Sequence, residues 1–79
     1  MKKLDLGEFI NDFASLFNDL QVQLTESTNF KEIEEWDSLV ALSLIALVDE
    51  KYGIRLLGED IRSVTTILEL YQKLLSKQY

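Results

Sequence analysis

Apolar residues recur along the chain in blocks whose spacing is typical of amphipathic helices. Three main helices are predicted, at about residues 5–20, 38–52 and 67–75, and a short helix is expected at 59–64. No proline interrupts these segments. The pattern therefore predicts an all-α protein, a small four-helix bundle with a long first loop. The repeating positions of the first helix are Phe9, Ile10, Phe13, Leu16, Phe17 and Leu20.

The central predicted helix is apolar around most of its circumference. Asp37 is a strong N-cap residue and Gly53 suits the position after a helix end, so about four turns are bounded on both sides. One face has the spacing of a core-packing stripe, and Leu39, Leu42 and Ala46 lie on the opposite side. A chain of 79 residues has too few elements to enclose every face of one helix, so this opposite side is expected to face a partner. The core-packing positions are Ala41, Leu44, Ile45, Val48 and Tyr52.

The connection between the first two main helices is long for a small domain. Within it, Phe30, Ile33 and Trp36 recur at intervals of three residues among charged side chains, which indicates a helical turn. A long loop is stable when its own side chains pack it down, and these three are its obvious apolar anchors. We therefore expect them to pin the loop to the core.

The last helix has a clear start signal. Thr66 and Glu69 match the capping-box pattern, in which a threonine and a glutamate satisfy each other's backbone N–H groups, and Thr65 is a rival cap. Residues 54–57, before the short helix, are expected to be extended or irregular. The apolar positions of the last helix are Ile67, Leu68, Leu70, Tyr71, Leu74 and Leu75.

Composition excludes several classes of function. The 79 residues include no cysteine and no histidine, so we expect no disulfide, Cys/His zinc site, thiolate nucleophile or histidine-based triad. Fourteen acidic against eight basic residues give a net charge of −6, which repels nucleic-acid phosphates and favours partners with basic patches. No apolar run is long enough to span a bilayer or follows the N-terminal lysines as in a signal peptide. We expect one cytoplasmic domain over residues 1–79, without membrane insertion.

Asp37, Ser38 and Leu39 open the central apolar helix near the middle of the chain, with helical segments on both sides. In this context the tripeptide resembles the Asp-Ser-Leu motif of acyl carrier proteins, and the likeness is strongest from about residue 30 to 75. The resemblance implies that 4′-phosphopantetheine is esterified to the Ser38 hydroxyl, where the positive end of the helix dipole favours an anion. It also implies that Asp37 assists the phosphopantetheinyl transferase in addition to capping the helix. The thiol that bears the acyl cargo would belong to the cofactor.

The resemblance further implies that partner enzymes dock on the exposed side of the central helix. These partners would be the phosphopantetheinyl transferase, an acyl-loading ligase or synthase, and acyltransferases, and a carrier that visits several enzymes is expected to be a monomer. Carriers of fatty-acid synthesis have acids from the first turn of this helix, whereas this chain has Val40 and Ser43, and Glu35-Trp36 replaces the usual small pair before the motif. We therefore expect a dedicated carrier of a specialised lipid, polyketide or acyl-transfer pathway rather than of general fatty-acid biosynthesis. The expected docking residues are Val40, Leu42, Ser43, Ala46, Asp49 and Glu50.

Other functions share parts of this pattern. A peptidyl or D-alanyl carrier would use the same attachment serine for an aminoacyl group, and the acid that an adenylating enzyme loads decides between the two kinds of carrier. An unmodified helical interaction module would use the stripe of Leu39, Leu42 and Ala46 without Ser38. Catalysis is disfavoured because Lys51, thirteen positions after Ser38, is too distant to act as its base.

Overall fold

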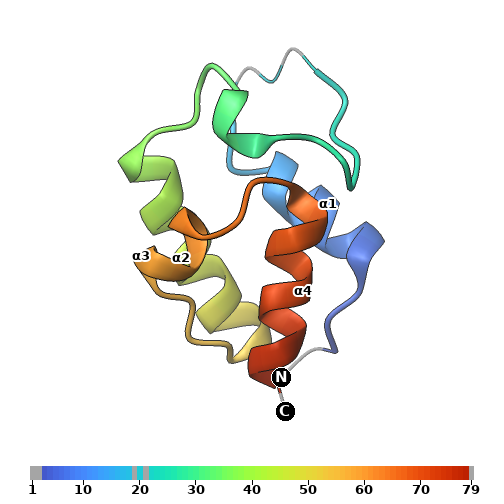
Figure 1. Ribbon diagram of the computed structural model, residues 1–79, viewed down its shortest axis with the longest axis vertical. Coiled ribbons are helices and arrows are strands. Elements are labelled where there is room, and N and C mark those ends of the chain that lie inside the picture. The colour runs from blue at the N-terminus through green and yellow to red at the C-terminus, as the bar shows by residue number, and fades with distance from the viewer. Residues whose placement is uncertain (1–2, 19, 21, 79) are drawn as a thin grey trace.

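The computed structural model describes residues 3–18, 20 and 22–78, which form four α-helices and one 3-10 turn. The helix α4 packs against α1 and α3, and in the view of Figure 1 it lies in front of α1 and α2. The predicted all-α bundle, with a short third helix and a long first loop, is confirmed. The elements are α1 (Leu6–Ala14), the 3-10 turn η1 (Phe30–Glu32), α2 (Ser38–Tyr52), α3 (Gly58–Arg62) and α4 (Ile67–Gln78).

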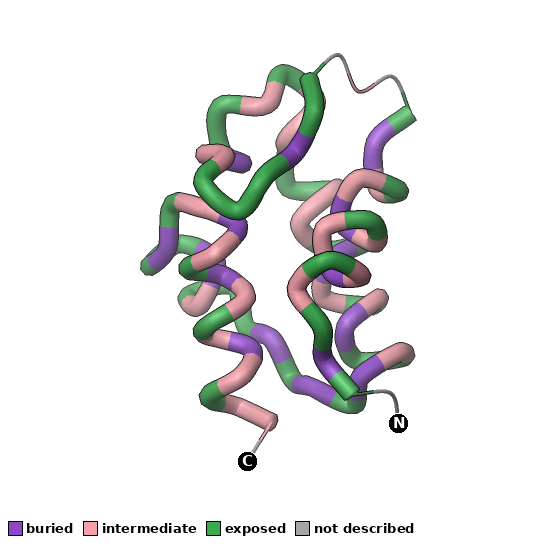
Figure 2. Tube along the Cα trace, turned by 90° about the vertical axis from the view of Figure 1, so that its right-hand side faces the viewer, coloured by how far each residue is buried: buried purple, intermediate pink, exposed green. Residues whose placement is uncertain are grey.

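The core is one cluster of aliphatic and aromatic side chains between the helices, and Figure 2 marks its buried positions along the trace. The Phe13 ring stacks on Trp36 with 5.8 Å between the ring centroids and meets the Phe30 ring edge-on at 5.7 Å. Phe30 is fully buried, and Ile33 and Trp36 pack against the same cluster. Aromatic pairs in these orientations stabilise by about 0.5–1.5 kcal/mol beyond their burial. The predicted anchoring of the long loop by these side chains is confirmed.

The long loop is also hydrogen-bonded to the head of α4. Two N–H groups in the first turn of α4 donate to loop carbonyls, at 3.1 Å to Thr28 and 2.8 Å to Glu26. The predicted capping box is confirmed, because the Glu69 N–H donates to Thr66 Oγ1 at 3.2 Å and the Thr66 N–H donates to Glu69 Oε1 at 2.9 Å. Thr65 is not the cap, although its N–H donates to the same carboxylate.

The first helix is shorter than its apolar repeat predicts. It ends at Ala14, whereas the predicted helix continued to Leu20. After Ala14, the N–H groups of Leu16 and Phe17 bond to carbonyls three residues back instead of four, which tightens and ends the helix. Apolar spacing does not indicate this change, because the turn still directs Phe17 into the core. Residues 19 and 21, at the predicted helix end and loop start, lie outside the described residues.

The segment after α2 follows the prediction with one shift. It is extended before α3, and its side chains Ile54 and Leu56 are buried. The helix α3 starts at Gly58 and ends at Arg62, so it lies slightly earlier than the predicted range 59–64. Its start is set by the Asp60 carboxylate, which accepts the Leu57 N–H at 2.9 Å.

The C-terminal end of α2 is tied to α1 by a charged cluster. Lys51 Nζ lies 2.8 Å from Asp12 Oδ1 and 2.8 Å from Glu8 Oε2, and the Tyr52 hydroxyl donates to the Asp12 carboxylate. Hydrogen bonds to the two carboxylates hold the pKa of Lys51 above its usual range, and burial together with the Asp12 bond raises the pKa of Tyr52. The apolar periodicity assigns Glu8 and Asp12 to the solvent side of the first helix. It does not reveal that α2 ends opposite them.

We expect the free energy of unfolding to fall at alkaline pH. In the folded chain the pKa values of Lys51 and Tyr52 are raised above their ordinary values of 10.5 and 10.0, so both groups bind their protons more tightly than in the unfolded chain. Their contribution is therefore complete below about pH 10 and is lost as the pH rises through the raised values. Asp12→Asn removes the negative charge to which both groups bond and should reduce this alkaline loss, whereas Asp49→Asn, at an exposed site, should not. Urea unfolding at about pH 8 and about pH 11 measures the difference, and equal losses in Asp12→Asn and the parent would contradict the prediction.

Candidate functional site

The head of α2 has the geometry that its capping signal predicts. The backbone of Asp37 is extended, and its Oδ1 accepts the Val40 N–H at 2.9 Å. The Asp37 carbonyl accepts the Ala41 N–H at 3.0 Å and starts the regular helical ladder. At the other end Gly53 has a φ of 68°, the left-handed conformation that closes many helices. Both predicted ends of α2 are confirmed.

Ser38 lies at the first position of α2, and its side chain is exposed. Among the described residues, none bonds to the Ser38 hydroxyl or accepts the backbone N–H groups of Ser38 and Leu39. The first turn of α2 contains no acidic residue. Unpaired N–H groups and the helix dipole at such a position favour an anion by about 0.3–1 kcal/mol. An anionic group attached to this hydroxyl therefore fits the residues around it.

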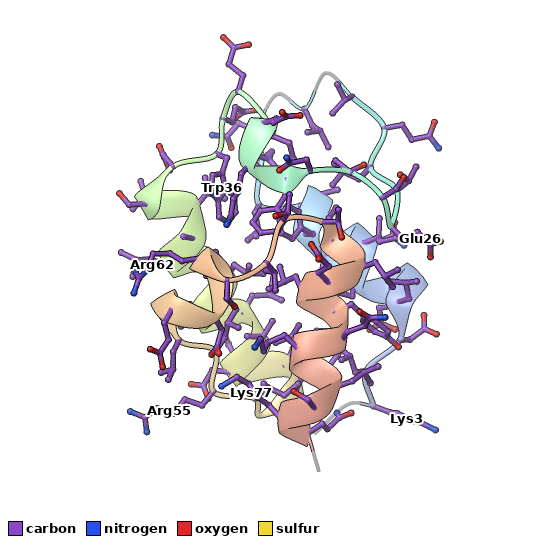
Figure 3. All side chains as sticks on the ribbon, viewed as in Figure 1. Lys3, Glu26, Trp36, Arg55, Arg62 and Lys77 are labelled. Atoms are coloured by element: carbon purple, nitrogen blue, oxygen red, sulfur yellow. The ribbon has the colours of Figure 1, made fainter. Side chains whose placement is uncertain are left out.

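The aromatic contact of Trp36 fixes the segment that leads into this helix. Figure 3 shows Trp36 directed from the loop into the bundle. Its ring is stacked on Phe13 and lies edge-on to Phe30, at a centroid distance of 4.9 Å from the latter. The backbone N–H of Trp36 donates to the Ile33 carbonyl at 3.0 Å. Ser38, two residues later, is thus exposed on a rigid support.

One side of α2 presents large apolar side chains to solvent. Leu39 and Leu42 expose 70% and 62% of their surface, and Ala46 is also exposed. Leu44 and Val48, on the opposite side, are fully buried. The long first loop therefore leaves the predicted apolar stripe uncovered. Of the other expected docking residues, Ser43, Asp49 and Glu50 are exposed and Val40 is half-buried.

The described part of the chain shows neither a membrane span nor a metal site. Within residues 3–18, 20 and 22–78, no helix is long and apolar enough to cross a membrane. No group of three or more Asp, Glu, His or Cys side chains in these ranges could hold a metal ion. The head of α2 and its apolar stripe remain the leading functional surface.

Comparison with known proteins identifies the family of the chain. No family model matches the chain. The chain is 35% identical over 78 residues to polyketide-8 synthase acyl carrier protein 2 of Streptomyces avermitilis, with 98% of this chain and 85% of that protein covered. It is also similar to the solution NMR structure of a holo acyl carrier protein from Geobacter metallireducens, with a TM-score of 0.73, 25% identity, and coverage of 91% of this chain and 83% of the other. The chain therefore belongs to the acyl carrier protein family.

Proposed function

We propose that the chain holds an acyl group on 4′-phosphopantetheine attached to Ser38 and presents it to partner enzymes without itself catalysing a reaction. Membership of the acyl carrier protein family implies a phosphopantetheine prosthetic group. The observation that supports Ser38 is its exposed hydroxyl beside two unpaired backbone N–H groups at a helix start. The group supplies a flexible arm and the thiol that bears the cargo, which suits a chain without cysteine.

The residues around Ser38 have separate roles in this proposal. Asp37 holds the helix start through its bond to the Val40 N–H, which fixes the Ser38 hydroxyl outside the bundle. The N–H groups of Ser38 and Leu39 favour the negative charge of a phosphodiester on that hydroxyl. Asp37 is also proposed to contact the phosphopantetheinyl transferase, because its carboxylate is exposed next to the serine.

Intact-mass measurement tests the attachment directly. Incubation of the full chain with coenzyme A, magnesium and a broad-specificity phosphopantetheinyl transferase is expected to add one phosphopantetheine group per molecule. The same reaction with the transferase of the source organism covers the case of a dedicated enzyme. A folded chain that gains no mass with either transferase would overturn the proposal.

We infer that Leu39, Leu42 and Ala46 form the surface on which partner enzymes dock. Exposed leucines at this spacing offer a continuous apolar contact, and contiguous exposed apolar surface is typical of protein–protein interaction sites. The partners are the phosphopantetheinyl transferase, an acyl-loading ligase or synthase, and acyltransferases. A carrier that presents this stripe to several enzymes in turn is expected to be a monomer.

We further propose that this carrier works in a specialised pathway, of which polyketide synthesis is the leading case. Two observations support this, the similarity to a carrier named for a polyketide synthase and the absence of acids in the first turn of α2. Electrostatic steering changes association rates by about 10-fold to 1,000-fold. A generic bacterial fatty-acid synthase is therefore expected to elongate the loaded chain at least about tenfold more slowly than its own carrier. Equal elongation rates would contradict the specialised assignment.

A further inference from the structure

A groove at one end of the bundle has no role in the proposed carrier function. It has a volume of about 710 Å³ and lies between Leu20, Val22 and Gln23 on one side and the segment 28–35 on the other. Figure 1 shows η1 and the loop residues that directly precede it at this end of the bundle. The groove lies outside the apolar stripe of α2, because none of its lining residues belongs to that helix.

The groove combines apolar side chains with one sign of charge. Val22 exposes 52% of its surface, and Leu20 and Ile33 are partly buried against the core. Three carboxylates lie on the wall formed by segment 28–35, and the described lining residues include no lysine or arginine. The other lining residues are uncharged polar ones. The acidic residues are Glu32, Glu34 and Glu35.

The basic residue of segment 28–35 is directed toward another part of the molecule. Lys31 Nζ donates to the carbonyl of Arg62 in α3 at 3.0 Å and lies over the Phe30 ring, 5.9 Å from its centroid. Lys31 is not among the lining residues of the groove. The carboxylates of the wall therefore determine the charge that an occupant meets.

The wall that bears these carboxylates is held in place before anything binds. The Asn29 side chain accepts the Lys31 N–H at 3.1 Å, and the Asn29 backbone pairs with Thr66 in an isolated antiparallel bridge. Phe30 is fully buried, and the Glu35 carboxylate accepts the N–H of Asn18 at 3.2 Å. A preformed wall lowers the ordering entropy that binding costs.

We propose that this groove docks a basic amphipathic segment of a partner protein. An aliphatic side chain of the segment packs against Val22 and Ile33, and its lysine or arginine side chains lie opposite the carboxylates of Glu32 and Glu34. Charge complementarity selects this occupant, because an acidic segment meets like charges at Glu32 and Glu34, whereas a wholly apolar one desolvates these two carboxylates without supplying a counter-charge. The docked segment lies close to the carrier serine, since Ser38 is three positions after Glu35, a span of at most about 11 Å.

A designed peptide tests the groove on the full chain. The probe is a synthetic helical peptide in which pairs of leucines alternate with pairs of lysines, titrated into ¹⁵N-labelled protein. Amide shift changes are expected to concentrate at Val22 and at residues 32–35. The double variant Glu32→Gln, Glu34→Gln is expected to weaken the affinity about tenfold. The matched double variant Glu26→Gln, Glu59→Gln removes the same charge at exposed sites outside the groove and should change the affinity by about twofold at most.

Each comparison has an outcome that overturns the proposal. Equal weakening by the two double variants would show attraction by net charge alone. Shift changes centred on Leu39 and Leu42 would place the peptide on α2 instead of the groove. A peptide with serine in place of leucine should bind at least about tenfold more weakly, and equal binding would exclude the apolar contact. Ser38→Ala protein should bind the leucine peptide as the parent does, so this test is separate from the loading reaction.

Discussion

A Ser38→Ala variant is expected to gain no mass in the loading reaction, whereas a Ser43→Ala variant gains one phosphopantetheine group as the parent does. Both serines are exposed on α2, so each of the two changes removes one serine hydroxyl from the surface of this helix. Only Ser38 lies at the helix start, next to the cap and the unpaired N–H groups that favour a phosphodiester. The loss at Ser38 should be complete, because no other oxygen replaces the one to be esterified.

The same variant separates a carrier from a plain interaction module. Ser38→Ala is expected to remain folded, with the free energy of unfolding within about 0.5 kcal/mol of the parent value, because the site is exposed and alanine suits a helix. Urea unfolding followed by circular dichroism checks this. A Ser38→Ala protein that still gains the group would show that attachment is elsewhere. One that retains full biological function would favour the interaction module.

Leu44→Ala is expected to lower the free energy of unfolding by about 2–5 kcal/mol, whereas Leu42→Ala changes it by about 0.5 kcal/mol or less. The two leucines are two positions apart on α2, and both changes remove the same atoms. Leu44 is fully buried, so its truncation leaves a cavity in the core, while Leu42 exposes 62% of its surface. A domain of this size has a total stability of only about 3–5 kcal/mol, so the Leu44→Ala chain should lose much of its stability.

Urea unfolding followed by Trp36 fluorescence and circular dichroism measures both effects. The Leu42→Ala chain should remain folded while its KM as a substrate of the transferase rises, since Leu42 belongs to the proposed docking stripe. An equal loss of stability in the two variants would show that Leu42 is covered in solution. That result would contradict both the monomeric state and the exposed stripe.

The sequence was sufficient where one side chain sets the local conformation. The helix α2 begins after Asp37 and ends before Gly53, as predicted. Thr66 and Glu69 start α4 through the predicted capping box. These signals are readable because donor and acceptor lie within about one helical turn of each other along the chain. The candidate site could be predicted for the same reason, since Ser38 and its cap are neighbours in sequence. Its assignment to an attachment role still rested on a family resemblance.

Only the tertiary structure decided the features that depend on distant residues. Lys51 reaches Asp12 across a separation of 39 residues, and neither position signals the other in the sequence. The early end of α1 at Ala14 was hidden because a turn and a helix can bury the same Phe17. The acidic groove likewise exists only because the long loop folds back beside η1. By itself the sequence determined which helix faces are apolar and where the capped helices begin, because periodicity and caps are local. Packing decides which apolar face is covered and which charged side chains meet, and periodicity does not encode packing.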